Sequence, residues 1–268
     1  MPRRAIFTLC CTLLGAASAS AHPEIEAALG RLNARIAAAP TEAGAYIERG
    51  ELYTRHEEWT AAEANFLVAA ELAPAHPRLD RARGALALAR GEPASARQML
   101  DRAVAVSPTD HEARVLRARA AAALGDTAAA ARDLAVVLDA LPSPPPELIL
   151  FHVGLLPPAA ALVQLEAMMA RVGPALVLQL RALEFEEATG RVDAALHRLG
   201  TLATQSERPE TWIRRRGDLL SRHGRAAEAR LAYAAALAAA LALPDWLRTS
   251  PDTRQFIAEL RPLVNPST

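Results

Sequence analysis

Residues 43–76 read AGAYIERGELYTRHEEWTAAEANFLVAAELAPAH, and this stretch decides the fold. Gly50 and Pro74 within it both recur 34 residues later, as Gly84 and Pro108. The same step links Pro40 to Pro74, Pro108 to Pro142, and Gly91 to Gly125. A constant period of this length is typical of a stacked unit made of two helices and a turn. The sequence therefore predicts a repeat architecture.

The residue types within this stretch suit two helices packed against each other. Gly50 and Ala62 are small enough for two helix backbones to approach closely, and Phe66 is large enough to fill the space beside that crossing. Pro74 ends the second helix, because proline has no backbone N–H to donate to a continuing helix. Strand patterns with a period of two residues are rare along the chain. We therefore expect an all-α fold.

Seven positions of this stretch match one family pattern of large, small, aromatic and proline residues. With Ala43 as the first residue of the unit, they are Tyr46, Gly50, Tyr53, Ala62, Phe66, Ala69 and Pro74. On these residues the chain resembles tetratricopeptide repeat (TPR) proteins. The resemblance implies an all-α, TPR-like α-solenoid of antiparallel helix pairs that form a right-handed superhelix. It also implies a scaffold that binds a protein or peptide partner in its concave groove.

Further units keep the same positions with less fidelity. They are Gly84, Ala96, Leu100 and Pro108 in the second unit, Ala118, Ala130, Leu134 and Pro142 in the third, and Gly217, Ala229 and Tyr233 in the last. The period breaks at residues 145–175, where a shortened repeat and a hinge are both open interpretations and the shortened repeat is preferred. Because one helix pair cannot bury its own apolar face, at least three stacked units are needed.

The predicted organisation has six parts. They are a secretory signal peptide (1–21), an N-terminal helix forming half a repeat (22–42), TPR units 1–3 (43–144), a degenerate helix pair or hinge (145–175), TPR units 4–5 (176–244), and a C-terminal capping helix and tail (245–268). The capping helix is expected over Asp252 to Leu263, because the terminal units of a stack need a polar outer face.

The first residues have the features of an export signal. Arg3 and Arg4 supply the positive charge, residues 5–17 form a short apolar stretch, and Ala19-Ser20-Ala21 fits the cleavage pattern. The apolar stretch is too short to span a membrane. We therefore expect export to the periplasm, with the extracellular space as the alternative, and no stable membrane insertion after cleavage. His22 would be the first residue of the mature chain.

Charge and cysteine content bear on the class of function. The 268-residue chain carries 30 basic and 30 acidic residues, and every basic residue is arginine. Nucleic-acid-binding proteins normally show a basic excess, so no nucleic-acid partner is expected. The two cysteines, Cys10 and Cys11, lie inside the predicted signal. The mature chain would therefore have neither a disulfide nor thiol chemistry.

The sequence contains no pattern typical of a catalytic or metal site. The seven histidines lack metal-ligand spacing, and carboxylate runs such as Glu57-Glu58 fit solvated helix faces. We expect no enzyme activity, no cofactor and no metal. One alternative is a metal- or small-ligand-binding accessory protein of the cell envelope, in which the amine and imidazole of a mature His22 bind copper. An envelope enzyme is a third hypothesis.

The groove-facing positions on the first helix of each unit carry mostly charged residues. They are Glu51, Arg55, Arg78, Arg81, Arg119, Glu184, Glu187, Arg214, Asp218 and Arg222, with Ile47 at an apolar position. Arginine binds carboxylates in a bidentate way, so these residues are candidates for holding the partner. The alternative is that they pair with one another inside the protein. The lysine-based clamp for chaperone C-termini, known in some TPR domains, is absent because the chain has no lysine.

Overall fold

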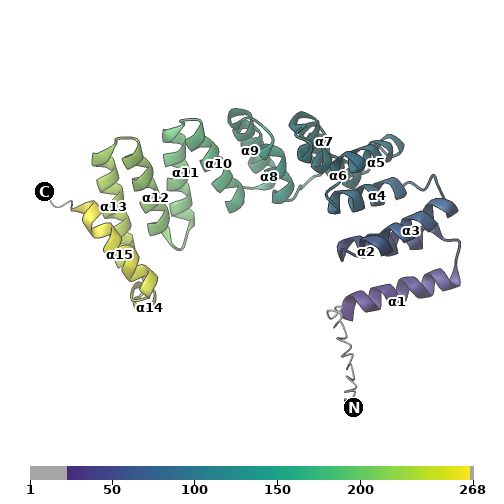
Figure 1. Ribbon diagram of the computed structural model, residues 1–268. Coiled ribbons are helices and arrows are strands. Elements are labelled where there is room, and N and C mark those ends of the chain that lie inside the picture. Colours follow the sequence, from purple (N-terminus) through teal and green to yellow (C-terminus); the bar gives the residue numbers. More distant parts are fainter. Residues whose placement is uncertain (1–22, 266–268) are drawn as a thin grey trace, which may run out of the picture. The chain divides into compact units, whose positions relative to one another are not determined.

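The computed structural model describes residues 23–265, and within this range it contains fifteen helices and no strand (Figure 1). The predicted all-α, TPR-like solenoid of helix pairs is confirmed. The chain divides into two compact units, Met1–Leu116 and Arg117–Thr268, and the division falls within one helix. The predicted signal peptide, residues 1–21, and His22 lie outside the described residues.

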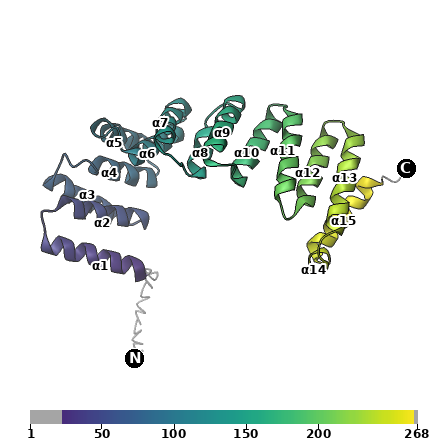
Figure 2. The same ribbon diagram turned by 180° about the vertical axis from the view of Figure 1, so that it is seen from behind.

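Consecutive helices form antiparallel hairpins within each unit (Figures 1 and 2). The first unit contains α1 (Pro23–Ala38), α2 (Ala43–Arg55), α3 (Trp59–Leu72), α4 (Leu79–Ala89), α5 (Pro93–Val106) and the start of α6 (His111–Ala123). The second unit contains the rest of α6, α7 (Thr127–Ala140), α8 (Pro146–Gly154), α9 (Pro158–Val172), α10 (Leu176–Ala188), α11 (Val192–Gln205), α12 (Pro209–Arg222), α13 (Ala226–Leu241), α14 (Asp245–Arg248) and α15 (Pro251–Val264).

Glycines set how closely the helices of a pair approach. A Cβ atom at Gly50 of α2 would lie 2.4 Å from the ring of Phe66 on α3. The equivalent distances are 2.6 Å from Gly84 to Leu100 and from Gly217 to Tyr233. In each pair the large residue follows the glycine by the same number of positions. The repeat is therefore built on one contact, in which a large side chain lies directly on a glycine backbone.

A second set of glycines ends the first helix of a pair. Gly91, Gly125, Gly190 and Gly224 have φ of 75°, 80°, 70° and 73°, the left-handed conformation that glycine adopts without strain. The first full unit has Glu57 at this position, with φ of 61°, and Glu57 stands 34 residues before Gly91. A non-glycine residue in this conformation is strained by contact between its Cβ and the following carbonyl.

Changing Glu57 to glycine is expected to raise the free energy of unfolding by about 1 kcal/mol, because it removes that strain. Urea denaturation followed by circular dichroism measures the change. The neighbouring Glu58→Gly variant is the control, because Glu58 has an ordinary φ of −83° and glycine there only adds freedom to the unfolded chain. Equal or opposite shifts for the two variants would contradict the expectation.

The irregular residues between 145 and 175 form the helix pair α8–α9, and apolar packing continues through it within the second unit. One cluster of buried residues includes Leu138 of α7, Ile149 and Val153 of α8, Leu165 and Met168 of α9, and Leu178 of α10. Arg171 of α9 also donates a 2.6 Å hydrogen bond to the carbonyl oxygen of Leu138, near the end of α7. Prolines at the start of α8 and α9 fit first helical positions, where an N–H has no partner to lose.

His152 of α8 is buried, and its Nδ1 atom has no hydrogen-bond partner. Burial lowers the pKa of His152, and the charge of Asp139 offsets this only in part. Because the folded protein holds this imidazole neutral, the unfolded chain binds a proton first as the pH falls. The contribution of neutral His152 to stability is therefore fully present above the pKa that this imidazole has in the unfolded chain. It is lost as the pH drops below that pKa.

We expect acidification from about pH 7.5 to about pH 5.5 to lower the melting temperature of the wild type more than that of His152→Leu. This window lies above the range in which the carboxylates titrate, so the difference between the two proteins isolates the imidazole. Thermal melts at several pH values measure it. Parallel curves for the two proteins would show that His152 does not contribute.

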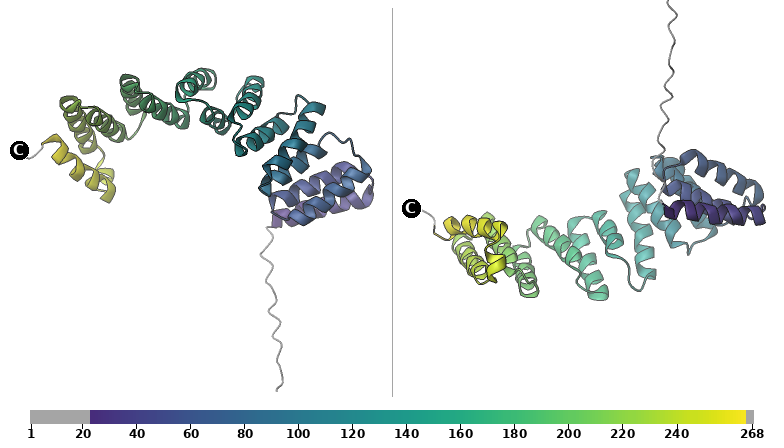
Figure 3. Two further views of the ribbon diagram at one scale, coloured as in Figure 1. Left: turned by 45° about the horizontal axis from the view of Figure 1, so that its top comes forward. Right: turned by 90° about the horizontal axis from the view of Figure 1, so that it is seen from below.

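The C-terminal helix is longer than expected, and a short helix precedes it. The capping helix was predicted over Asp252 to Leu263, whereas α15 begins at Pro251 and ends at Val264. It packs against α13 (Figure 3). Its Leu260 is fully buried and belongs to the same cluster as Tyr233 and Ala236 of α13. Helix α14, of four residues, was not predicted, because so short a segment has no periodicity to detect. No helix among residues 23–265 is long and apolar enough to cross a membrane.

Candidate partner-binding groove

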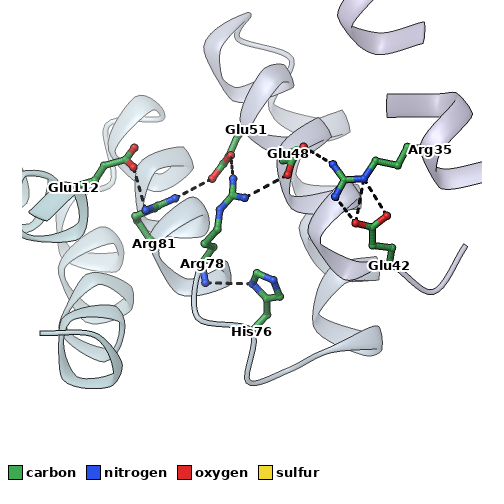
Figure 4. A network of polar contacts seen from close by, with 8 residues as sticks. All are labelled: Arg35, Glu42, Glu48, Glu51, His76, Arg78, Arg81 and Glu112. Atoms are coloured by element: carbon green, nitrogen blue, oxygen red, sulfur yellow. Dashed lines mark hydrogen bonds and ion pairs between the residues drawn. The ribbon is translucent and has the colours of Figure 1, made fainter. Parts of the chain in front are cut away.

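A row of alternating charges connects α1, α2, α4 and α6 in the first unit (Figure 4). Arg35 of α1 contacts Glu42 and lies 2.8 Å from Glu48. Arg78 lies 3.4 Å from Glu48 and 2.6 Å from Glu51, and Arg81 lies 3.6 Å from Glu51 and 3.0 Å from Glu112. We call this set the charge chain: Arg35, Glu42, Glu48, Glu51, Arg78, Arg81 and Glu112.

The middle of the charge chain is shielded from water. The side chains of Arg81 and Glu51 are 15% and 23% exposed, so their attraction is screened less than that of a surface pair. Arg81 also lies 3.1 Å from Asp110, whose carboxylate accepts a hydrogen bond from the backbone N–H of Ala113 at the start of α6. At the exposed end, the hydrogen bond from Arg35 lowers the pKa of Glu42. The charge chain therefore links successive helix pairs.

Two neighbouring hollows lie along the charge chain. The first, of ≈ 390 Å³, lies between α1 and α2 and is lined by Ala28, Arg31, Leu32, Arg35, Glu48, Glu51, Leu52 and Arg55. The second, of ≈ 290 Å³, lies between α2, α4 and α6 and is lined by Glu51, Thr54, Arg55, Arg78, Arg81, Ala82, Ala85, Glu112 and Leu116. Glu51 and Arg55 line both hollows, so the two are adjacent, and we call them together the groove of the first unit.

Arg31 and Arg55 are exposed and have no ion pair among residues 23–265. Arg55 stands one helical turn after Glu51, a spacing at which opposite charges normally pair. Glu51, however, is already held by Arg78 and Arg81. Arg31 has only alanines and Arg35 at the pairing positions of its helix. These two arginines are therefore the groove charges that remain available for a ligand.

In the second unit, most of the predicted groove residues pair with one another or with nearby helices. Glu184 lies 2.6 Å from Arg181, and Glu187 lies 2.9 Å from Arg222 and 3.7 Å from Arg215. Arg214 lies 2.6 Å from Glu259 of α15, and Asp218 accepts a 2.9 Å hydrogen bond from the Tyr233 hydroxyl. Arg119 is exposed and has no ion pair in the described range.

The structure thus brings Glu51, Arg55, Arg78 and Arg81 together along one groove. It excludes Ile47 from contact with a partner, because this side chain is fully buried between α2 and its neighbours. Sequence reasoning also missed Arg31, because groove positions were assigned only to complete units and Arg31 lies on the half repeat. The pairing alternative is realised, but mainly between neighbouring helix pairs within each unit, where sequence spacing gives no signal.

Metal binding by this part of the chain has no support in the geometry. No group of three or more His, Cys, Asp or Glu side chains among residues 23–265 is placed to hold a metal ion. The copper hypothesis depends on His22, which lies outside the described residues, and it stays a prediction.

The stacked antiparallel helix pairs define a helical-repeat fold, and the groove of its first unit runs along α1, α2, α4 and α6. Residues 77–120 match the family model described as tetratricopeptide repeat. A TPR repeat-containing protein from Cytophaga hutchinsonii shares 12% identity, with a TM-score of 0.63 over 87% of this chain and 94% of that one. The family match is confined to residues 77–120, and the chain as a whole shares the fold of tetratricopeptide repeat proteins.

Other solved structures share the fold at similarly low identity. A tetratricopeptide repeat protein from Parabacteroides merdae is 16% identical, with a TM-score of 0.51 over 90% of this chain and 92% of that one. Pseudomonas aeruginosa PilF is 15% identical, with a TM-score of 0.55 over 68% of this chain and 84% of that one. No curated protein matches the sequence significantly. At these identities the likeness is one of fold.

Proposed function

We propose that this protein is an exported scaffold that binds a protein or peptide partner in the groove of its first unit. The observation that carries the proposal is the pair of arginines without ion pairs, Arg31 and Arg55, in a groove whose other charges are satisfied internally. Charges that are already paired within the protein are not available to pair with a ligand. Two exposed cations beside partly apolar walls instead favour recognition of a chain with complementary charge.

The shape of the groove favours a polypeptide segment as the ligand. The two hollows follow one another along successive helices and share residues, so a ligand that fills both must be elongated. Grooves between helices bind extended segments or amphipathic helices through apolar anchors. Leu32 and Leu52 in the first hollow, and Ala85 and Leu116 in the second, provide apolar contacts of this kind.

A pull-down from an envelope extract of the source cells tests the scaffold function. The full-length chain is compared with the Arg31→Glu/Arg55→Glu double variant, and Arg132→Glu is the charge-matched control because Arg132 is exposed and lies on α7. We expect specific proteins to be lost from the double variant and retained by the control. Identical proteins in equal amounts from all three would contradict a role for the groove.

Export rests on the sequence features of residues 1–21. Cleavage after Ala21 would leave His22 at the start of the mature chain and release both cysteines with the signal. Cell fractionation with intact-mass measurement tests this. The expected product is a cysteine-free chain in the periplasmic or extracellular fraction, and an uncleaved cytoplasmic chain would contradict export.

A further inference from the structure

The chemistry of the groove narrows the class of partner, and this inference rests on the proposed function. Five arginines and three glutamates line the two hollows: Arg31, Arg35, Arg55, Arg78 and Arg81, with Glu48, Glu51 and Glu112. Each glutamate already contacts at least one arginine of the charge chain. Arg35 and Arg81 also have carboxylate partners just outside the hollows, Glu42 and Asp110. The charges without a partner are both positive.

The position of the two arginines indicates how a ligand would lie. Arg31 lines only the first hollow, whereas Arg55 lines both. A ligand with one anionic group at each arginine therefore runs from α1 across α2. In the first hollow its side chains meet Leu32 and Leu52, which line the same hollow as both arginines. The groove thus fits alternating anionic and apolar groups.

The anionic groups fit carboxylates on a peptide better than the phosphates of a nucleic acid. Glu48, Glu51 and Glu112 stand along the groove walls. A nucleic-acid strand, with a charged phosphate at every nucleotide, would place phosphates beside these carboxylates, and such like-charge contacts are costly. A peptide with spaced acidic residues avoids them. The planar guanidinium also matches the two oxygens of a carboxylate in a bidentate pair.

We propose that the groove of the first unit binds an extended peptide segment of alternating acidic and apolar residues, with one carboxylate at Arg31 and another at Arg55. Arg78 and Arg81 do not bind the ligand directly. They hold Glu51 away from Arg55 and so keep that arginine free. Loss of both Arg78 and Arg81 would release Glu51 toward Arg55 and weaken binding, although neither arginine contacts the peptide.

Fluorescence anisotropy with the full-length chain tests the proposal. The probe is a labelled peptide of alternating glutamate and leucine, and the matched peptide has glutamine in place of glutamate. We expect the glutamate peptide to bind at least tenfold more tightly than the glutamine peptide. Arg31→Gln and Arg55→Gln should each weaken binding about tenfold, in line with the loss of one charge-assisted hydrogen-bonded contact. Arg132→Gln should leave it unchanged, and added salt should weaken it.

Equal affinity for the two peptides would overturn the proposal, and so would unchanged binding by both groove variants. Tighter binding of single-stranded oligothymidylate than of the glutamate peptide, abolished by the same variants, would assign the arginines to phosphate and would also overturn it. Circular dichroism and melting temperature verify that each variant is folded. If the pull-down shows a groove-dependent partner while the glutamate peptide fails to bind, the acidic segment is wrong and the scaffold function stands.

Discussion

Replacing Gly50 with alanine is expected to lower the free energy of unfolding by about 1–3 kcal/mol, although alanine is the better helix former. The added Cβ would lie 2.4 Å from the ring of Phe66, a distance at which one group must move. Phe66 is 1% exposed, so its ring has no open space to enter. The helices α2 and α3 must therefore separate. Urea denaturation followed by circular dichroism measures the loss.

A matched substitution in the same unit separates crowding from helix propensity. Gly30 lies inside α1 and has nothing within 4 Å of a Cβ, so Gly30→Ala is expected to stabilise the protein by up to about 1 kcal/mol. Shortening the large residue should also rescue the first variant, with Gly50→Ala/Phe66→Leu losing less than the sum of the two single changes. Gly50→Ala with wild-type or higher stability would contradict the close helix contact.

Replacing Leu165 with alanine is expected to lower the free energy of unfolding of the second unit by about 2–5 kcal/mol. Leu165 is fully buried on α9, in the cluster that joins α7, α8, α9 and α10. Truncation leaves a cavity, because helices held on both sides cannot close the space completely. Chemical denaturation monitored by circular dichroism measures the effect.

The control lies on the same helix. Val163 is 65% exposed, and Val163→Ala is expected to change stability by no more than about 0.5 kcal/mol. A small effect of Leu165→Ala, equal to that of the control, would show that residues 145–175 act as a hinge without a shared core. A large effect supports continuous packing through this irregular pair.

The repeat architecture could be predicted from sequence because it depends on particular residue types at fixed spacing along the chain. Gly50 and Phe66 form one such helix contact. The same contact recurs at the same spacing in sequence between Gly84 and Leu100 and between Gly217 and Tyr233. This pattern is visible in the sequence because few residues other than a glycine opposite a large side chain fit at such a helix crossing. The sequence places Glu57 on a solvated helix face, which is wrong, because Glu57 lies in the turn after α2. It breaks the chemical pattern while keeping the backbone conformation of its glycine counterparts.

The state of the groove charges could not be predicted in the same way. Arg55 and Glu51 have the spacing of a helical ion pair, yet Glu51 instead pairs with Arg78 and Arg81 of the next helix pair in the same unit. Which arginine remains free is thus decided by the packing of one helix pair on another, far apart in sequence. Arg31 belongs to the groove only because α1 stacks on α2.

Site-specific photo-crosslinking tests most directly whether a partner occupies the groove. A photoreactive residue replaces Ala28 in the first hollow or Ala85 in the second, and exposed Ala128 of α7 serves as the control position. We predict that the same partner is captured from positions 28 and 85 in the source cells, that Arg31→Glu/Arg55→Glu abolishes capture, and that position 128 captures none of it. Capture from position 128 alone, or equal capture from all three positions, would contradict binding in the groove.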